Sequence, residues 1–203
     1  MGSNRIMIIL AAPIAAGKST LIKQLKEDGF YHIKTVTTRK PRGSTDNEYI
    51  FLPRWQLRWL TWWHRFIWFE SVGEHFYSIR RRELEPARTT HSLVCITPTS
   101  RRAIGELRDF CGGLGITPIF LFLEPPEQEV LRSRAFERLP VEQRTDKAMR
   151  SIEKRLDREM RWSDLVCHQR KYNIAPWHSI APGTKAEVLY RVYRILTSQL
   201  AVP

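Results

Sequence analysis

A loop of nine residues near the N-terminus constrains the fold of this chain more than any other feature. Its residues are, in order, Ala12, Pro13, Ile14, Ala15, Ala16, Gly17, Lys18, Ser19 and Thr20. The loop follows the apolar run Ile6 to Ala11 and opens a stretch, Ser19 to Asp28, that has the apolar spacing of a helix. This order is typical of a P-loop, in which backbone N–H groups and a helix N-terminus surround a phosphate. We therefore expect a nucleoside triphosphate, ATP, to bind here.

Three residues of the loop, Lys18, Ser19 and Ala12, determine whether it can bind a triphosphate with Mg²⁺. Lys18 would reach the β- and γ-phosphate oxygens, and the hydroxyl of Ser19 would ligate Mg²⁺. Ala12 stands where the P-loop pattern has its first glycine. Alanine has only one methyl group more than glycine, so the loop keeps its course if φ at Ala12 is negative, whereas a positive φ would be costly.

Short apolar runs alternate with longer amphipathic stretches along the chain. Three runs have the β-branched composition of buried parallel strands: Ile6 to Ala11, His91 to Ile96 and Ile116 to Leu123. Five stretches have helical spacing: Ser19 to Asp28, Ser100 to Cys111, Pro126 to Phe136, Thr145 to Trp162 and Lys185 to Leu200. Gly112 and Gly113 are the expected C-cap of the second stretch. The alternation predicts an α/β fold of the P-loop NTPase type, with a mainly parallel sheet and flanking helices.

The charge balance indicates which partners to expect. There are 33 Lys and Arg against 21 Asp and Glu, so the formal net charge is +12 and the sequence pI is about 10.1. A basic surface attracts polyanions, which makes phosphate-bearing ligands the first class to consider and nucleic acid a further one. A surplus of arginine that only keeps the protein soluble is the alternative.

Composition excludes several other classes. With 42% hydrophobic residues, the chain has enough apolar side chains for a full core and is not disordered as a whole. No apolar run reaches the roughly 18–20 residues of a membrane span, so no membrane partner is expected. Cys95, Cys111 and Cys167 are odd in number and widely spaced, which favours a reducing cytoplasm. The six histidines lack metal-ligand spacing, so no structural metal is expected beside Mg²⁺.

A second group of motifs resembles the guanylate kinase family. These motifs are the segment Thr35-Val36-Thr37-Thr38-Arg39-Lys40-Pro41-Arg42, the stretch Asp46 to Tyr49 with Phe51, the pair Phe76-Tyr77, and Arg144 with Arg155 eleven residues further on. The resemblance covers the chain from Arg5 to about Leu200. It implies one domain over residues 1–203, with a core of 1–30 and 91–203, a lid near 132–150, and a small acceptor-binding insertion over 31–90.

The resemblance also implies roles for particular residues. The positions that match the family's acceptor-phosphate residues are Arg39, Arg42, Tyr49 and Tyr77. Lys18, Arg144 and Arg155 match the residues that stabilise the transferring phosphoryl group. These residue types suit that chemistry, because guanidinium groups hold phosphate bidentately and phosphoryl transfer depends on positioning and positive charge.

Three departures fall on positions that contact guanine in the family. Thr35 stands where the family has serine, Trp68 where it has the base-reading glutamate, and Thr97 where it has an aspartate. A carboxylate accepts hydrogen bonds from the guanine N1–H and amino group, whereas an indole stacks or donates a single N–H. The expected base is therefore not ordinary guanine, although Glu70, two residues after Trp68, could substitute in part.

The stretch from residue 54 to 68 holds five of the seven tryptophans. Trp55, Trp59, Trp62 and Trp63 have the i, i+4, i+7, i+8 spacing of one helix face, and the prediction is a small helix that buries this aromatic face. Arg54, Arg58 and Arg65 follow one side of the same stretch, and arginine beside exposed indole would suit DNA. Both interpretations stay open.

These observations predict an ATP-dependent kinase of the guanylate kinase type. The preferred acceptor is a hydroxymethylated pyrimidine base in DNA, because the charge of +12, the Arg/Trp stretch and the lost guanine-reading residues all favour it. Bacteriophage P-loop kinases that look related phosphorylate such bases, and this resemblance implies a phage-encoded protein in the host cytoplasm. The alternatives are a free nucleoside monophosphate with another base and an inactive interaction module, against which Lys18 and Ser19 speak. An alcohol acceptor needs a general base. The candidates are Glu70, placed first, and Glu74, Asp46 and Glu124.

Overall fold

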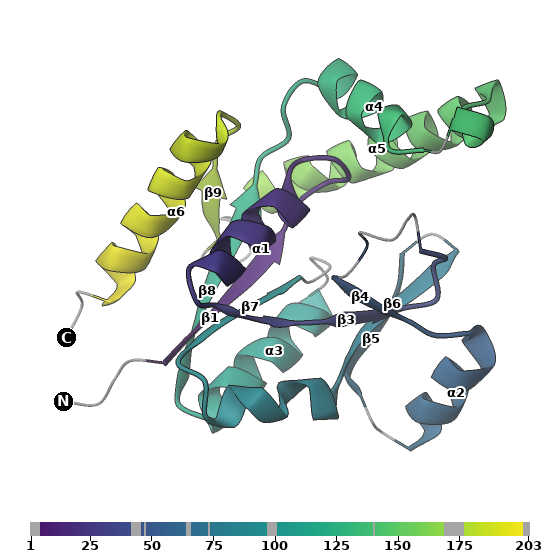
Figure 1. The fold of residues 1–203 in the computed structure, drawn as a ribbon. Helices are drawn as coiled ribbons and strands as arrows, with labels where there is room; N and C mark the ends of the chain where they lie inside the picture. The colour runs from purple at the N-terminus through teal and green to yellow at the C-terminus, as the bar shows by residue number, and fades with distance from the viewer. Residues whose placement is uncertain are drawn as a thin grey trace. The chain divides into compact units, whose positions relative to one another are not determined.

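The computed structural model describes residues 5–41, 46, 48–63, 66–72, 74–96, 101–139, 141–168 and 177–200. The strands are β1 (Arg5–Ala11), β2 (Tyr31–Ile33), β3 (Thr35–Thr37), β4 (Tyr49–Phe51), β5 (Phe66–Val72), β6 (His75–Arg80), β7 (Ser92–Ile96), β8 (Ile116–Leu123) and β9 (His178–Ile180). The α-helices are α1 (Lys18–Glu27), α2 (Arg54–Trp62), α3 (Arg101–Gly113), α4 (Gln128–Glu137), α5 (Asp146–His168) and α6 (Lys185–Leu200). Two 3₁₀ helices, η1 (Arg81–Arg88) and η2 (Val141–Gln143), complete the described elements (Figure 1).

The larger sheet has five strands in the order β2-β7-β1-β8-β9. β1 and β2 both pair in parallel with β7, and β8 pairs in parallel with β9. The strands β1, β7 and β8 begin and end within one residue of the predicted runs. They are almost entirely buried, as expected of parallel strands covered on both faces. The predicted α/β fold of the P-loop NTPase type is confirmed.

The predicted helices are present, with corrections at two helix ends: α5 continues to His168, six residues beyond the predicted Trp162, and α3 ends later than expected. α3 continues through Gly112 and Gly113, so these residues are not its C-cap. The left-handed residue after the helix is Gly115, with φ of +63°, and its N–H donates to the carbonyl oxygen of Gly112. Glycine suits this position because it has no Cβ to clash. No helix among the described residues is long and apolar enough to span a membrane.

The chain divides into two compact units. The first contains residues 1–10 and 22–119, and the second contains residues 11–21 and 120–203. The first unit holds a second sheet of four strands in the order β4-β3-β6-β5, which lies within the predicted acceptor-binding region 31–90. The second unit holds the P-loop together with α4 and α5.

One face of the four-stranded sheet is apolar and is covered by α2. Val36 of β3, Leu57 of α2 and Phe66 of β5 form a buried cluster. The partly buried side chains packed around it are Ile50, Leu52, Leu60, Phe69 and Phe76. Residues alternate between the two faces of a strand, so Thr35 and Thr37, which flank Val36, belong to the opposite face.

The prediction that α2 buries its tryptophans is wrong. The exposed fractions of Trp55, Trp59, Trp62 and Trp63 are 72%, 57%, 83% and 58%. The buried stripe of the helix is formed by Leu57 and Leu60 instead. At 100° per residue, the leucine and tryptophan stripes lie on opposite sides of the helix, and each satisfies helical spacing. Spacing by itself could not tell which stripe faces the sheet. α2 also ends at Trp62, so it is shorter than the predicted stretch.

Candidate functional site

The P-loop of the second unit contains two residues with left-handed backbone. Among the described residues, Ala15 is the one non-glycine residue with a positive φ, at +62°, and Gly17 has φ of +99°. Ala12 therefore does not have the positive φ that would have been costly there. The strained position of the loop is Ala15, since left-handed backbone costs a non-glycine residue about 1–3 kcal/mol.

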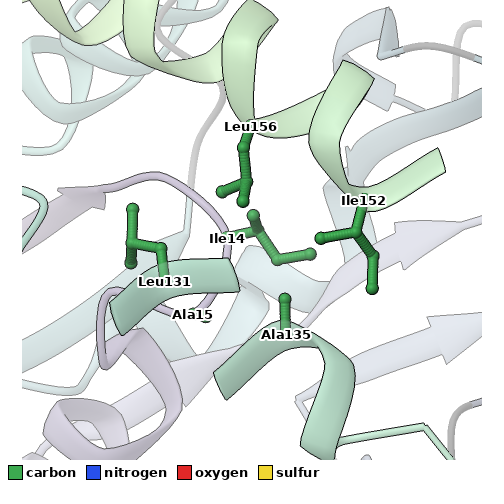
Figure 2. Close-up of a cluster of buried hydrophobic side chains, with 6 residues drawn as sticks. All are labelled: Ile14, Ala15, Leu131, Ala135, Ile152 and Leu156. Carbon is green, nitrogen blue, oxygen red and sulfur yellow. The ribbon is translucent and has the colours of Figure 1, made fainter. Parts of the chain in front are cut away.

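Packing of the loop tip against α4 and α5 offsets this strain. Ile14 and Ala15 are buried in one cluster with Leu131 and Ala135 of α4 and with Ile152 and Leu156 of α5. Figure 2 shows Ile14 pointing into the space between these helices. Burying one methyl group stabilises by about 0.8 kcal/mol, which is comparable to the strain at Ala15. The apolar loop tip thus fixes the P-loop to α4 and α5.

The ammonium group of Lys18 contacts the first two residues of the loop. Its Nζ donates to the carbonyl oxygens of Ala12 and Pro13, the latter at 2.8 Å. Lys18 and Ser19 begin α1, where the helix dipole favours anions, and Ser19 and Thr20 are exposed. Ammonium, backbone N–H groups and a serine hydroxyl are thus grouped at one helix N-terminus, as a polyphosphate with a bound Mg²⁺ requires.

Glu159 of α5 contacts both the loop and one of the predicted catalytic arginines. Its carboxylate accepts a hydrogen bond from the backbone N–H of Ile14. The same carboxylate accepts from Nε of Arg155 at 2.6 Å. The structure thus connects Arg155 to the P-loop through a carboxylate. Sequence reasoning missed Glu159, although its position four residues after Arg155 on a helix was the signal that could have found it.

Arg144 has a different environment in the second unit. Its side chain is exposed, and it donates to the carbonyl oxygens of Glu137, at 2.8 Å, and Leu139, at 3.0 Å. These carbonyls lie at and just after the end of α4, where helix carbonyls lack intrahelical partners. In this structure Arg144 therefore stabilises the end of α4, and the structure does not bring it together with Arg155.

In the first unit, the polar face of the four-stranded sheet collects the predicted acceptor residues. Register pairs Thr35 with Tyr49 and Thr37 with both Phe51 and Tyr77. Tyr77 is paired with Glu70 in turn. Side chains directly opposite one another in a sheet share a face. The rings of Tyr49 and Tyr77 meet edge to face with centroids 6.3 Å apart.

Arg39 lies at the end of this face and is 8% exposed. Its guanidinium lies over the rings of Tyr49 and Phe51, at 4.8 and 5.2 Å from their centroids. Both oxygens of Asp46 accept from it, at 2.6 and 3.1 Å. Stacking on aromatic rings and bidentate pairing are the geometry in which arginine recognises phosphate. Here a carboxylate of the chain occupies that position.

Trp68 lies in the core, whereas the sequence predicts that it contacts the acceptor base. Its indole is 1% exposed, and its carbonyl oxygen accepts from the hydroxyl of Ser78 on the neighbouring strand. A side chain this deeply buried presents no ring face to a ligand. The register of β5 against β6 is irregular between Phe66 and Phe69, the stretch that contains Trp68, and the burial of the indole could not be predicted from its position along the strand. Glu70 is paired with Tyr77 and so lies on the polar face of the sheet that carries Thr35, Thr37 and Tyr77, which we call the acceptor face.

The other predicted acceptor residues and bases have varied positions. Thr35 is buried, and its hydroxyl donates to the carbonyl oxygen of Ile96 at 3.1 Å. Arg42 and Thr97 lie outside the described residues. Glu74 is exposed in the turn before β6. Glu124 is partly buried directly after β8, and no group of three or more potential metal ligands occurs within the described part of the chain.

The fold and the loop define the class: this is an α/β protein with a P-loop. No protein-family model matches the chain. It is 33% identical over 137 residues to guanylate kinase of Polaromonas sp., an alignment that covers 63% of this chain and 62% of that protein. It is 26% identical over 161 residues to guanylate kinase of Sus scrofa, covering 77% and 75%.

A solved structure shares the fold. The crystal structure of guanylate kinase from Anaplasma phagocytophilum matches with a TM-score of 0.66 at 20% identity, covering 98% of this chain and 88% of that one. The chain is thus similar in sequence to guanylate kinases and shares the fold of one of known structure.

Proposed function

We propose that the protein transfers the γ-phosphoryl group of ATP to the phosphate of a nucleoside monophosphate. The observation that carries the proposal is the coexistence of two phosphate-binding arrangements. One is the P-loop with Lys18 and Ser19, and the other is Arg39 stacked on Tyr49 and Phe51. The proteins to which the chain is similar bear the name guanylate kinase, which agrees with this assignment.

On the donor side, the P-loop residues 12–20 would bind the polyphosphate. Lys18 would leave the loop carbonyls to contact the β- and γ-phosphates, and Ser19 would hold Mg²⁺ together with phosphate oxygens and water. One protein hydroxyl is enough for this ion, because Mg²⁺ keeps several waters and is shared with the substrate. Arg155 would stabilise charge on the transferring group once Glu159 releases it, and Arg144 is the second such candidate from the sequence.

On the acceptor side, Arg39 would bind the monophosphate bidentately, with the hydroxyls of Tyr49 and Tyr77 as further donors. Arg42 belongs to the same predicted set. Phosphate carries more negative charge than the carboxylate of Asp46 and offers three oxygens, so it can replace that carboxylate on the guanidinium. In the absence of substrate, the carboxylate of Asp46 would thus occupy the place on Arg39 where the acceptor phosphate binds.

Base recognition would rest on Glu70 and Thr35. Glu70 is opposite Tyr77 on the acceptor face, whereas Trp68 is in the core. A carboxylate there can accept from the N1–H and amino group of guanine, so the structure favours guanine more than the sequence does. A phosphate acceptor is already anionic and needs no general base, which leaves Glu70 available to bind the base.

A second candidate acceptor is a hydroxymethylated pyrimidine within DNA, the acceptor preferred from the sequence. The observation that favours it is again Glu70. A carboxylate beside Tyr77 on the acceptor face could serve as general base for an alcohol. A phage-encoded origin belongs to this candidate alone. The two candidates differ in the atom that receives the phosphoryl group.

A labelled γ-phosphate transfer assay tests the proposal. The acceptors are GMP, dGMP, AMP, CMP, UMP, and DNA with plain or hydroxymethylated cytosine. We expect transfer to a purine monophosphate and a loss of at least about a hundredfold in kcat for Lys18→Ala. Lys23→Ala is the matched control, since Lys23 is exposed on the same helix. Transfer that is unaffected by Lys18→Ala, or label entering hydroxymethylated DNA alone, would contradict the proposed monophosphate kinase.

A further inference from the structure

The outer face of α2 exposes an unusual amount of aromatic surface for a helix of nine residues. Its indoles are those of Trp55, Trp59 and Trp62, and Trp63 follows at the C-cap. Trp59 and Trp63 contact one another with ring centroids 6.0 Å apart and planes tilted by 51°. Large exposed apolar patches on a protein mark interaction sites. We call these four tryptophans with Arg54 and Arg58 the α2 face.

A groove lies beside the α2 face, between the helix and the sheet. Its volume is about 650 Å³, within the range of small-ligand sites. It is lined by Arg54, Leu57, Arg58, Thr61, Trp62, Phe69 and Phe76. The rings of Phe69 and Phe76 are stacked with centroids 5.0 Å apart. The lining of the groove therefore combines aromatic rings with two arginines.

The two charged residues of the α2 face are both arginines, and the exposed acid Glu74 lies beside Arg54. Arg54 and Arg58 are exposed, and Arg54 is anchored by a 2.6 Å hydrogen bond to the carbonyl oxygen of Glu74. The sequence has no Asp or Glu between residues 49 and 69. With a net charge of +12 for the chain, the patch attracts anions, and its aromatic rings favour an anion that can also stack.

The spacing of the side chains suggests a repeating ligand. Arg54 and Arg58 are four residues apart, as are Trp55 and Trp59, which places each pair about 6 Å apart along the helix. Each arginine precedes a tryptophan by one residue, so the arginine row and the tryptophan row are about 100° apart around the helix axis and run parallel along it. Alternating cations and ring faces match a chain of alternating phosphates and bases. We propose that the α2 face and its groove bind single-stranded nucleic acid.

The structure favours this ligand over a lipid surface. Helices that insert into a membrane interface bury an apolar face among the acyl chains. In α2 the aliphatic side chains Leu57 and Leu60 pack against the sheet, so the exposed side chains are the indoles, the two guanidinium groups and Thr61. Indoles stack and guanidinium groups bind phosphate, which is how proteins hold single strands without reading sequence.

The α2 face is also separate from the acceptor face. α2 packs on Val36, which belongs to the face of the sheet opposite Thr35, Thr37 and Tyr77. A strand bound at α2 would therefore not occupy the proposed monophosphate position. The inference goes beyond the proposed function, and either of the two can fail without the other.

Fluorescence anisotropy with labelled oligodeoxythymidylate, longer than the roughly 16 nucleotides covered by large sites of this type, tests the inference. We expect Trp59→Ala with Trp62→Ala to weaken binding at least about fivefold for each indole, without changing the salt dependence. Arg54→Ala with Arg58→Ala should reduce the log–log salt slope by about 1.4, because two phosphate contacts are lost. Kinase turnover on free monophosphate should be unchanged in both double variants.

Matched controls remove the same groups elsewhere. Arg81→Ala with Arg108→Ala deletes two exposed arginines away from α2, and Tyr190→Ala deletes an exposed ring on α6. Anionic phospholipid vesicles are the competing probe. Equal losses in control and α2 variants, or vesicle binding that depends on the tryptophans while oligonucleotide binding does not, would overturn the inference. Thermal melting and the conservative Trp59→Phe, which should restore part of the affinity, separate loss of binding from loss of fold.

Discussion

Glu159 accepts a hydrogen bond from the backbone N–H of Ile14 and so places a carboxylate against the tip of the P-loop. Asp46 similarly places a carboxylate on the guanidinium of Arg39. In each unit, a group proposed to bind phosphate is paired with an anionic side chain of the same chain. Such pairs keep buried or half-buried donors satisfied in the absence of substrate, and they must be exchanged when phosphate binds.

The pair at the P-loop predicts a gain of affinity from a conservative change. Glu159→Gln keeps an oxygen acceptor for Ile14 but removes the charge that competes with phosphate and holds Arg155. We expect ATP to bind about five- to tenfold more tightly, because the negative charge of Glu159 no longer repels phosphate and Arg155 is no longer held in an ion pair. Isothermal titration calorimetry measures this, with Glu153→Gln as the control because Glu153 pairs with Arg132 on the lid surface. Weaker ATP binding by Glu159→Gln would show that the carboxylate supports the site instead.

The pair at Arg39 predicts a stability effect that phosphate reverses. Asp46→Asn leaves a guanidinium that is 8% exposed without its counter-charge, which costs up to about 3 kcal/mol of unfolding free energy. Inorganic phosphate or monophosphate should restore the melting temperature of Asp46→Asn more than it raises that of the parent. Glu85→Gln is the control, since Glu85 forms an exposed pair with Arg88. Equal phosphate-induced shifts in the two proteins would argue against phosphate binding at Arg39.

Ala15 and Gly17, the two P-loop residues with positive φ, should respond differently to exchange between alanine and glycine. Gly17→Ala has open space for a methyl group but forces φ of +99° on a residue with a Cβ, and should cost about 1–3 kcal/mol. Ala15→Gly relieves strain but loses a buried methyl group, so we expect a change within about 1 kcal/mol of zero. Urea unfolding of both variants provides the comparison. A large loss for Ala15→Gly would mean that packing against α4 and α5 outweighs backbone strain.

His32 predicts a loss of stability in mild acid. Burial, with Lys26 and Lys34 nearby, lowers the pKa of His32 from 6.5 to about 4. Between these values the unfolded chain binds a proton that the folded protein does not, so stability falls as pH decreases from 6.5 toward 4, by about 3 kcal/mol in all. His32→Leu should flatten this part of the pH profile of unfolding free energy, whereas the exposed His91→Leu should not. An unchanged slope in His32→Leu would assign the acid sensitivity to other groups.

Those parts of the protein whose structure depends on residues close by in the chain could be predicted from the sequence alone. The apolar run before Ala12, the loop through Thr20 and the helix after it are local patterns, and the structure forms them as predicted. The buried strands Ser92–Ile96 and Ile116–Leu123 were equally readable, because continuous β-branched runs have few other solutions.

Tertiary structure decided which faces these elements present. α2 has two stripes with helical spacing, and contact with the sheet selected Leu57 and Leu60 over the tryptophans. Trp68 is buried in the core, whereas Glu70, two residues further along β5, is paired with Tyr77. Glu159 and Ile14 are 145 residues apart, and no local pattern relates them. Periodicity specifies a stripe, but the partner that buries one stripe and leaves another in solvent is a property of the folded chain.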